Sequence, residues 1–310
     1  MDIHHPVFWI ATILVLIFVL GTLMAPEEAK GVFNGAKAWS INYFDWLFMV
    51  AGNIFVLFCL SLIFLPFGKV RIGGADAKPE FSTISWFAML FAAGMGIGLM
   101  FWSVAEPTAY YTDWYGTPLN APAKTPAGAD LAMGATMFHW GLHPWAIYAV
   151  VGLSLAFFTY NKGLPLTIRS GFFPLMKDRS WGWFGHIVDI VAVLATIFGL
   201  ATSLGFGAQQ AASGLSFLFG ISNGLPTQVA IIIGVTAVAV ISVVRGLEGG
   251  VKVLSNINMG LAAILLLFVL LLGPTIAIFT TMGTTALNYL ENIVPLSNWI
   301  GREDDKFYHG

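Results

Sequence analysis

Six long stretches of this chain contain no Asp, Glu, Lys or Arg, and each is long enough to cross a lipid bilayer. They are residues 3–26, 46–68, 81–105, 131–161, 190–244 and 253–290. A helix needs about 20 consecutive apolar residues to span the hydrocarbon core, where lipid offers no partner to a free backbone amide. Only 10% of the 310 residues are charged, against about 25% in soluble domains, and the mean hydropathy is +0.81. The sequence therefore predicts an all-α polytopic membrane protein.

Seven transmembrane helices are expected from these stretches. Residues 190–244 are too many for one span, and polar, Gly and Pro residues interrupt them, so we divide them into spans near 187–206 and 226–244. The last span is expected near 257–282. The first stretch is interpreted as a retained span because no Lys or Arg precedes it and it is long for the apolar region of a secretory signal.

The distribution of basic residues predicts the orientation in the membrane. One set of alternate loops holds nine of the 14 Lys and Arg residues and the other set holds five. Cytoplasmic loops carry the excess of Lys and Arg, so we expect a cytoplasmic N-terminus, an external C-terminal segment and a multi-pass protein of the plasma membrane, which is the inner membrane of a bacterium.

Charge and cysteine content exclude several classes of function. The net charge of −2 provides no basic surface for a nucleic acid. Cys59 is the single cysteine of the sequence, which excludes an intrachain disulfide framework and a thiolate metal cluster.

Three glycines fall within five residues of the third stretch, at Gly94, Gly96 and Gly98. Glycine costs about 1 kcal/mol relative to alanine in a helix interior. One interpretation is a close-packing face, since Gly94 and Gly98 have the small-xxx-small spacing. The other is a locally unwound helix whose carbonyls bind a cation, as in transporters with broken helices. Gly96, which close packing does not require, favours unwinding.

The fourth stretch places large aromatic side chains on one broad face, at Trp140, Trp145 and Tyr148. Aromatic rings around a cation attract it and suit quaternary ammonium groups, which have no N–H to donate; ordinary packing between helices is the alternative. Pro144 is expected to kink this helix. His139 and His143 lie on the opposite face, where hydrogen bonds to other helices are favoured over zinc binding.

Hydroxyl groups and a few charges complete the polar content of the spans. Thr196 and Ser203 share a face of the fifth span, where they either bond back to their own helix or supply oxygen ligands to a monovalent cation. Asp45, Glu106 and Asp189 fall near predicted span ends. Glu106, which Pro107 follows, is expected to end the third span.

Several of these segments together resemble the betaine/choline/carnitine transporter family, from about Asp45 to Gly310. The segments are Gly94-Met-Gly-Ile-Gly-Leu-Met-Phe-Trp-Ser-Val-Ala-Glu-Pro107, Phe138-His-Trp-Gly-Leu-His-Pro-Trp-Ala-Ile-Tyr148, Gly163-Leu-Pro-Leu-Thr-Ile-Arg-Ser170 and Leu254-Ser-Asn-Ile-Asn-Met259. The string from His139 to Trp145 makes the resemblance highly specific.

The resemblance implies a secondary transporter of the leucine-transporter type, with twelve spans in which two inverted repeats of five follow two extra helices. Residues 1–80 would hold the two extra helices and a cytoplasmic loop, residues 81–283 the first repeat and residues 284–310 an external segment. The second repeat would follow Gly310, so the chain is expected to be the first part of a truncated transporter. A homotrimer is a further implication.

The resemblance also implies roles for individual residues. Trp140, Trp145 and Tyr148 would form an aromatic cage for a trimethylammonium substrate, glycine betaine first of all, facing the segment Gly94–Gly98. Sodium would be the coupling ion, with no other cofactor. Its expected ligands are the carbonyls of Ala92 and Met95 and, at a second site, Thr196 and Ser203.

Two single positions bear on ion coupling. By the resemblance, a glycine at position 98 is typical of sodium-coupled betaine carriers, whereas proton-coupled choline carriers tend to have an acidic residue at this position. Leu200 stands where a sodium-coupled betaine carrier has a threonine, which puts the second sodium site in doubt.

Other classes of membrane protein remain as alternatives. An ion channel also uses glycine-rich carbonyl filters. A seven-helix receptor has the same number of spans, although a retinal protein would need a mid-membrane lysine that residues 253–290 lack. An enzyme is not expected, because no His-Glu-x-x-His or comparable acid/base pair occurs at membrane depth.

Overall fold

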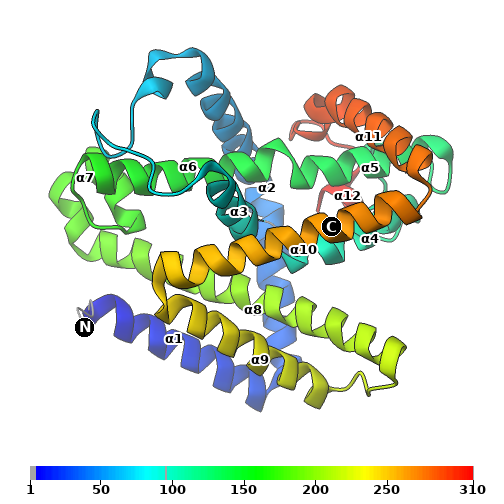
Figure 1. Cartoon of the computed structure of the whole chain (residues 1–310), viewed down its shortest axis with the longest axis horizontal. Helices are drawn as coiled ribbons and strands as arrows, with labels where there is room; N and C mark the ends of the chain where they lie inside the picture. The colour runs from blue at the N-terminus through cyan, green and yellow to red at the C-terminus, as the bar shows by residue number, and fades with distance from the viewer. Residues whose placement is uncertain (1–4, 95, 310) are drawn as a thin grey trace.

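The computed structural model describes residues 5–94 and 96–309, and the described residues form helices joined by loops, with no strand (Figure 1). Among the described residues, six helical stretches are long and apolar enough to cross a membrane, with Pro126–Asn161 and Leu247–Leu272 each counted as one. The number becomes seven when the bent pair Thr83–Gly94 and Ile97–Tyr111 counts as a single span. This confirms the expectation of an all-α polytopic protein.

The helices have the following bounds. The long ones are α1 (His5–Met24), α2 (Pro26–Phe64), α8 (Trp183–Phe219), α9 (Leu225–Val244), α10 (Lys252–Leu272) and α11 (Thr275–Leu296). Two spans are interrupted, one into α3 (Thr83–Gly94) and α4 (Ile97–Tyr111), the other into α5 (Pro126–Trp140) and α6 (Leu142–Ala156). The short helices are α7 (Phe173–Met176) and α12 (Asp305–Tyr308), with 3₁₀ turns at Pro66–Lys69, Pro118–Asn120, Ile168–Phe172 and Lys177–Trp181 and π turns at Phe157–Asn161 and Leu247–Val251.

Helix α2 begins 20 residues before the predicted start of the second span at residue 46. Pro26 occupies its first turn with Glu27 and Glu28, and proline and acidic residues both favour a helix N-terminus. Its 39 residues extend for about 58 Å, well beyond the roughly 30 Å hydrocarbon core. The search for charge-free stretches therefore found only the apolar half of this helix.

The last predicted span, 257–282, is wrong at its C-terminal end. Helix α10 stops at Leu272 because Gly273 and Pro274 follow it, and α11 starts at Thr275. Helix α11 packs against α5 and is not among the candidate spans. The expected boundary between residues 283 and 284 therefore falls inside α11.

A small core lies where α4, α5, α11 and α12 meet. Its buried members are Tyr110, Ala132, Ala135, Phe138, Tyr289, Leu296 and Phe307. Ala132 and Ala135 let α11 approach α5 closely, as small residues do between membrane helices. In contrast, none of the residues of α9 is buried, which fits a helix that faces lipid. Figure 1 shows α11 above one end of α5, with α12 close by.

Contacts between loops agree with the expected alternation of sides. Asn161, at the end of the fourth span, accepts a hydrogen bond from Gly73 N–H at 2.9 Å and donates to the Arg71 carbonyl at 2.8 Å. Lys306 donates to the Asp113 carbonyl at 2.7 Å. Each contact joins two segments that the count of basic residues places on one side of the membrane.

The three acidic residues near span ends all have partners. Asp189 pairs with Arg169, with 3.1 Å between Arg169 Nε and Asp189 Oδ2. Asp45 lies 3.0 Å from His309 Nε2. Glu106 does not end its span as predicted: α4 continues through Pro107 to Tyr111, and Glu106 is buried within it.

Candidate functional site

The third span is broken at its glycines. Helix α3 ends at Gly94 and α4 begins at Ile97, and the two helix axes are bent by 57°. Met95 lies outside the described residues. The last four carbonyls of a helix have no partner within it, and the Ala92 carbonyl belongs to this last turn of α3. The structure thus favours the unwound helix over the continuous close-packing face.

Gly94 and Gly98 face the two tryptophans of the fourth span. A Cβ atom added at Gly94 would lie only 2.6 Å from Trp145 Cη2, and one added at Gly98 would lie 3.4 Å from Trp140 Cη2. The broken helix and the aromatic residues are therefore in direct contact. Gly94 leaves no room for any larger residue unless the Trp145 indole moves.

Alanine at Gly94 and at Gly98 is expected to have different effects. Because its added methyl group would overlap the Trp145 ring, Gly94→Ala should lower the free energy of unfolding by about 1–3 kcal/mol, as overpacking does. The methyl group of Gly98→Ala would make an ordinary contact with Trp140, so this variant should change the free energy of unfolding much less. Unfolding of the purified variants in detergent, followed by tryptophan fluorescence, measures both; equal stability of the two variants would contradict this geometry.

The fourth span is broken at Gly141 rather than at Pro144. Gly141 is the C-cap of α5 and the N-cap of α6. Pro144 lies in the first turn of α6, where a missing N–H costs no intrahelical hydrogen bond. The Leu142 N–H freed by the break donates to the Tyr289 hydroxyl of α11 at 3.0 Å. Trp140 and Trp145 consequently stand on opposite sides of this break.

The third aromatic residue lies beside Trp145. The ring centroids of Trp145 and Tyr148 are 5.8 Å apart with 41° between their planes. Trp140 and Trp145 are half-buried, and Tyr148 is 55% exposed. Trp145 and Tyr148 thus form a pair of rings beside Gly94, and the Trp140 ring lies beside Gly98.

Glu106 is the site residue that the sequence analysis did not assign. Its carboxylate accepts a hydrogen bond from Trp140 Nε1 at 2.8 Å and from the Tyr110 hydroxyl at 3.1 Å, and it lies 2.5 Å from His139 Nδ1. A carboxylate within a membrane span is a functional candidate by default. That signal was present, but the neighbouring Pro107 argued for a helix end.

The two histidines have separate partners, as expected for hydrogen bonds between helices. His139 of α5 binds Glu106 of α4. His143 of α6 donates through Nε2 to Asn53 Oδ1 of α2 at 2.9 Å, and Asn53 donates in turn to the Ser297 carbonyl at 3.0 Å. The His pair thus holds α2, α4 and the end of α11 around the break in the fourth span.

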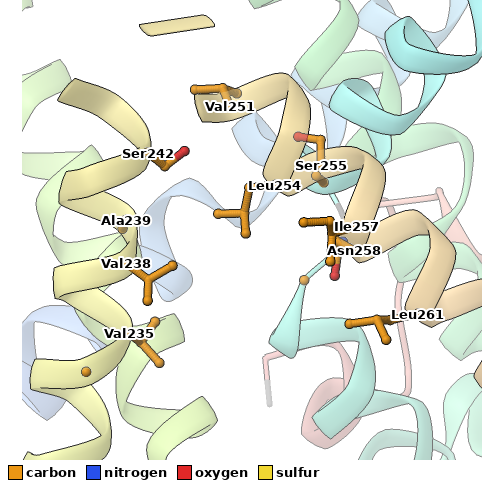
Figure 2. A pocket seen from close by; sticks show the side chains of 13 residues that line it. Val235, Val238, Ala239, Ser242, Val251, Leu254, Ser255, Ile257, Asn258 and Leu261 are labelled. Atoms are coloured by element: carbon orange, nitrogen blue, oxygen red, sulfur yellow. The ribbon is translucent and has the colours of Figure 1, made fainter. Parts of the chain in front are cut away.

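A cavity of about 570 Å³ lies on the other side of the broken third span. Ala92 and Gly96 line it, and no atom lies within 4 Å of a Cβ placed at Gly96. Figure 2 shows α9 and α10 facing each other across this cavity, with Leu254 of α10 in the gap. Ser242, Ser255 and Asn258 provide its polar groups. Gly94 and Gly98 therefore face the indoles, whereas Ala92 and Gly96 face the cavity.

Thr196 and Ser203 are not brought to Ala92 by any described contact. The Thr196 hydroxyl donates to the Ala192 carbonyl at 2.8 Å and lines a different hollow, together with Arg169 and Asp189. Ser203 is exposed on α8. Thr196 thus makes the bond within its own helix that was one of the two expectations.

Comparisons with known proteins agree with this architecture. The model of the betaine/carnitine/choline family of transporters matches residues 6–310. Glycine betaine transporter 1 of Vibrio parahaemolyticus is 60% identical over the whole chain, and a glycine betaine/proline/choline/ectoine transporter of the same organism is 56% identical. The glycine betaine transporter OpuD of Bacillus subtilis is 44% identical over 94% of the chain.

The chain spans 59%, 55% and 56% of the lengths of these three relatives. The match to the family model covers nearly every residue, including both broken spans and the aromatic residues that contact the glycines. This chain belongs to the betaine/carnitine/choline family of transporters.

Proposed function

We propose that this chain carries the aromatic substrate site of a secondary transporter for glycine betaine, coupled to sodium. The observation that carries the proposal is the contact between the broken third span and the indoles of Trp145 and Trp140. A trimethylammonium group has no N–H to donate, so aromatic faces are the groups best suited to recognise it. Relatives at 60% and 44% identity are named glycine betaine transporters, which supports the same substrate class.

The break at Gly94 supports a sodium ion near the substrate. The carbonyl end of α3 carries partial negative charge and unpaired oxygens, and Ala92 belongs to this end. Gly98, in the first turn of α4, brings no carboxylate that would carry a proton. We therefore assign sodium to the Ala92 carbonyl; the resemblance adds the carbonyl of Met95, which lies outside the described residues. No described contact brings Thr196 and Ser203 to Ala92, so a second sodium ion has less support.

Transport is tested in a chimaera, because the chain matches 59% of the length of its Vibrio relative. This chain replaces the matching segment of glycine betaine transporter 1, and the protein is reconstituted into liposomes. We expect saturable uptake of labelled betaine that requires an inward sodium gradient and persists when a proton gradient alone is collapsed. The parent transporter and empty liposomes serve as controls.

The possible results separate the substrate from the coupling ion. Undiminished betaine uptake with potassium in place of sodium would refute sodium coupling and leave the substrate assignment intact. A folded chimaera that takes up no betaine, beside an active parent, would refute the substrate assignment. A steady conductance without saturation by betaine would favour a channel.

For the location, we propose the plasma membrane with a cytoplasmic N-terminus, because nine basic residues lie in one set of alternate loops and five in the other.

A further inference from the structure

A buried carboxylate lies directly behind the proposed substrate site. Glu106 is 6% exposed, and each of its two oxygens has a separate task. Oε2 accepts from the Trp140 indole, whereas Oε1 is held by the Tyr110 hydroxyl and by His139 Nδ1. Burial of a carboxylate is expensive unless it is paired and hydrogen-bonded. Three partners on two helices make Glu106 a fixed acceptor.

The Trp140 ring is fixed at both of its edges by α4. Its pyrrole edge donates to Glu106 at 2.8 Å, and its far edge, at Cη2, lies against Gly98. Glu106 and Gly98 are eight residues apart on one helix, so the indole lies along α4 between them. Without Glu106, the ring would have a steric limit at Gly98 but no directional contact to fix its rotation.

The partners of Glu106 are themselves held in place. Tyr110 and His139 both pack against Phe307 of α12, with ring centroids 4.8 Å and 6.0 Å away, and the His139 and Phe307 planes are nearly parallel. Tyr110 and Phe307 are buried in the small core. The carboxylate is therefore supported from behind by packed aromatic rings, which is the arrangement expected of a preorganised site.

We propose, on the basis of the proposed function, that Glu106 is a positioning residue that orients Trp140 and determines the preference of the site for a cationic headgroup. An indole N–H bonded to a carboxylate makes a strong, charge-assisted hydrogen bond. The bond draws the N–H proton toward the oxygen and increases the electron density on the ring face that meets the substrate. The carboxylate also adds a negative charge at the Nε1 edge of the ring whose face meets the substrate.

A double-mutant cycle in the chimaera separates this role from a purely structural one. Glu106→Gln keeps the size of the side chain and an oxygen for Trp140 but removes the charge; Trp140→Phe removes the donor. Glu106→Gln alone should weaken betaine binding about tenfold, or about 1.4 kcal/mol, because it replaces the charge-assisted bond that orients Trp140 with a neutral one and removes the negative charge beside the ring. In the Trp140→Phe background the same change should have little further effect.

Specificity provides a readout that a general loss of stability would not change. The carbon isostere 3,3-dimethylbutanoate has the shape of betaine without its positive charge. The preference for betaine over this isostere should fall in Glu106→Gln and stay unchanged in the matched controls Glu291→Gln and Trp114→Phe, which alter exposed residues outside the site. Equal losses of affinity with and without Trp140, or an unchanged preference, would overturn the proposal.

The hydrogen bond itself is tested without substrate on the 310-residue chain in detergent. The chain has 11 tryptophans, and the indole N–H signal of Trp140 is assigned in ¹⁵N–¹H spectra by its loss in Trp140→Phe. That signal should move upfield in Glu106→Gln and Glu106→Ala but not in Glu291→Gln; a signal that stays in place would overturn the proposal. If the bond is present and the unmodified chimaera still fails to transport betaine, the proposed function fails while the positioning of Trp140 by Glu106 stands.

Discussion

Replacing Asp189 by alanine is expected to lower the free energy of unfolding by about 3–5 kcal/mol, the usual effect of leaving a buried charge without its partner. Arg169 and Asp189 are 7% and 8% exposed. Their side chains are 3.1 Å apart, and the Arg169 backbone N–H also donates to Asp189 at 3.2 Å. The Arg169 side chain has further contacts with His186 and the Trp181 ring. These contacts supply no negative charge, so the guanidinium would remain uncompensated.

The measurement is chemical unfolding of the chain in detergent, with Asp178→Ala as the control. Asp178 is exposed, and a substitution there should change stability by less than about 0.5 kcal/mol. The double variant Arg169→Met with Asp189→Leu should recover most of the loss, because an apolar pair of similar volume replaces a buried ion pair with little change. Similar stability of Asp189→Ala and Asp178→Ala would show that the pair is solvated and contributes little.

Replacing Trp145 by alanine is expected to weaken betaine binding in the chimaera by at least tenfold and by about thirtyfold when the cation is fully desolvated. A cation over an aromatic ring gains on the order of 2 kcal/mol in such a site. Trp145→Phe keeps an aromatic face and should lose less. Trp145 is the ring that contacts both Gly94 and Tyr148, so its removal takes away the aromatic face beside the broken third span.

The binding constant is measured by titration of betaine against the purified chimaera. Trp114→Ala is the matched control, because this tryptophan is 70% exposed beyond the end of α4 and stacks only on its neighbour Tyr115 among the ring contacts described. Betaine should bind the control as it binds the unmodified protein. The same affinity in Trp145→Ala as in Trp114→Ala would remove Trp145 from the site.

The spans were predictable from the sequence because hydrocarbon imposes length and polarity on any helix that crosses it. The rule failed where other physics sets the ends of a helix. At α2, Pro26 and two acidic residues start a helix far outside the apolar stretch. At α10, Gly273 and Pro274 end one within an apolar stretch. A search for stretches without charged residues detects neither of these helix ends.

The candidate site was predictable in its residue types and less so in its contacts. Three closely spaced glycines indicated the break in the third span, since the spacing is a local property of the chain. The role of Glu106 was not accessible, because its partners Trp140 and His139 come from another helix. In the same way, Pro144 suggested a kink, whereas the break at Gly141 depends on a Tyr289 hydroxyl from α11.

Helix α11 contacts the fourth span at its break, beside Gly141. Trp140 ends α5 and Trp145 lies in α6, so the angle between these two helices sets the spacing of the two indoles. The Tyr289 hydroxyl holds the first N–H of α6 from a position 147 residues further along the chain. A Cβ at Gly141 would lie 2.9 Å from that hydroxyl, so the break and the Tyr289 side chain are in close contact. Helix α11 therefore contacts the chain at the junction between the two helices that carry the indoles.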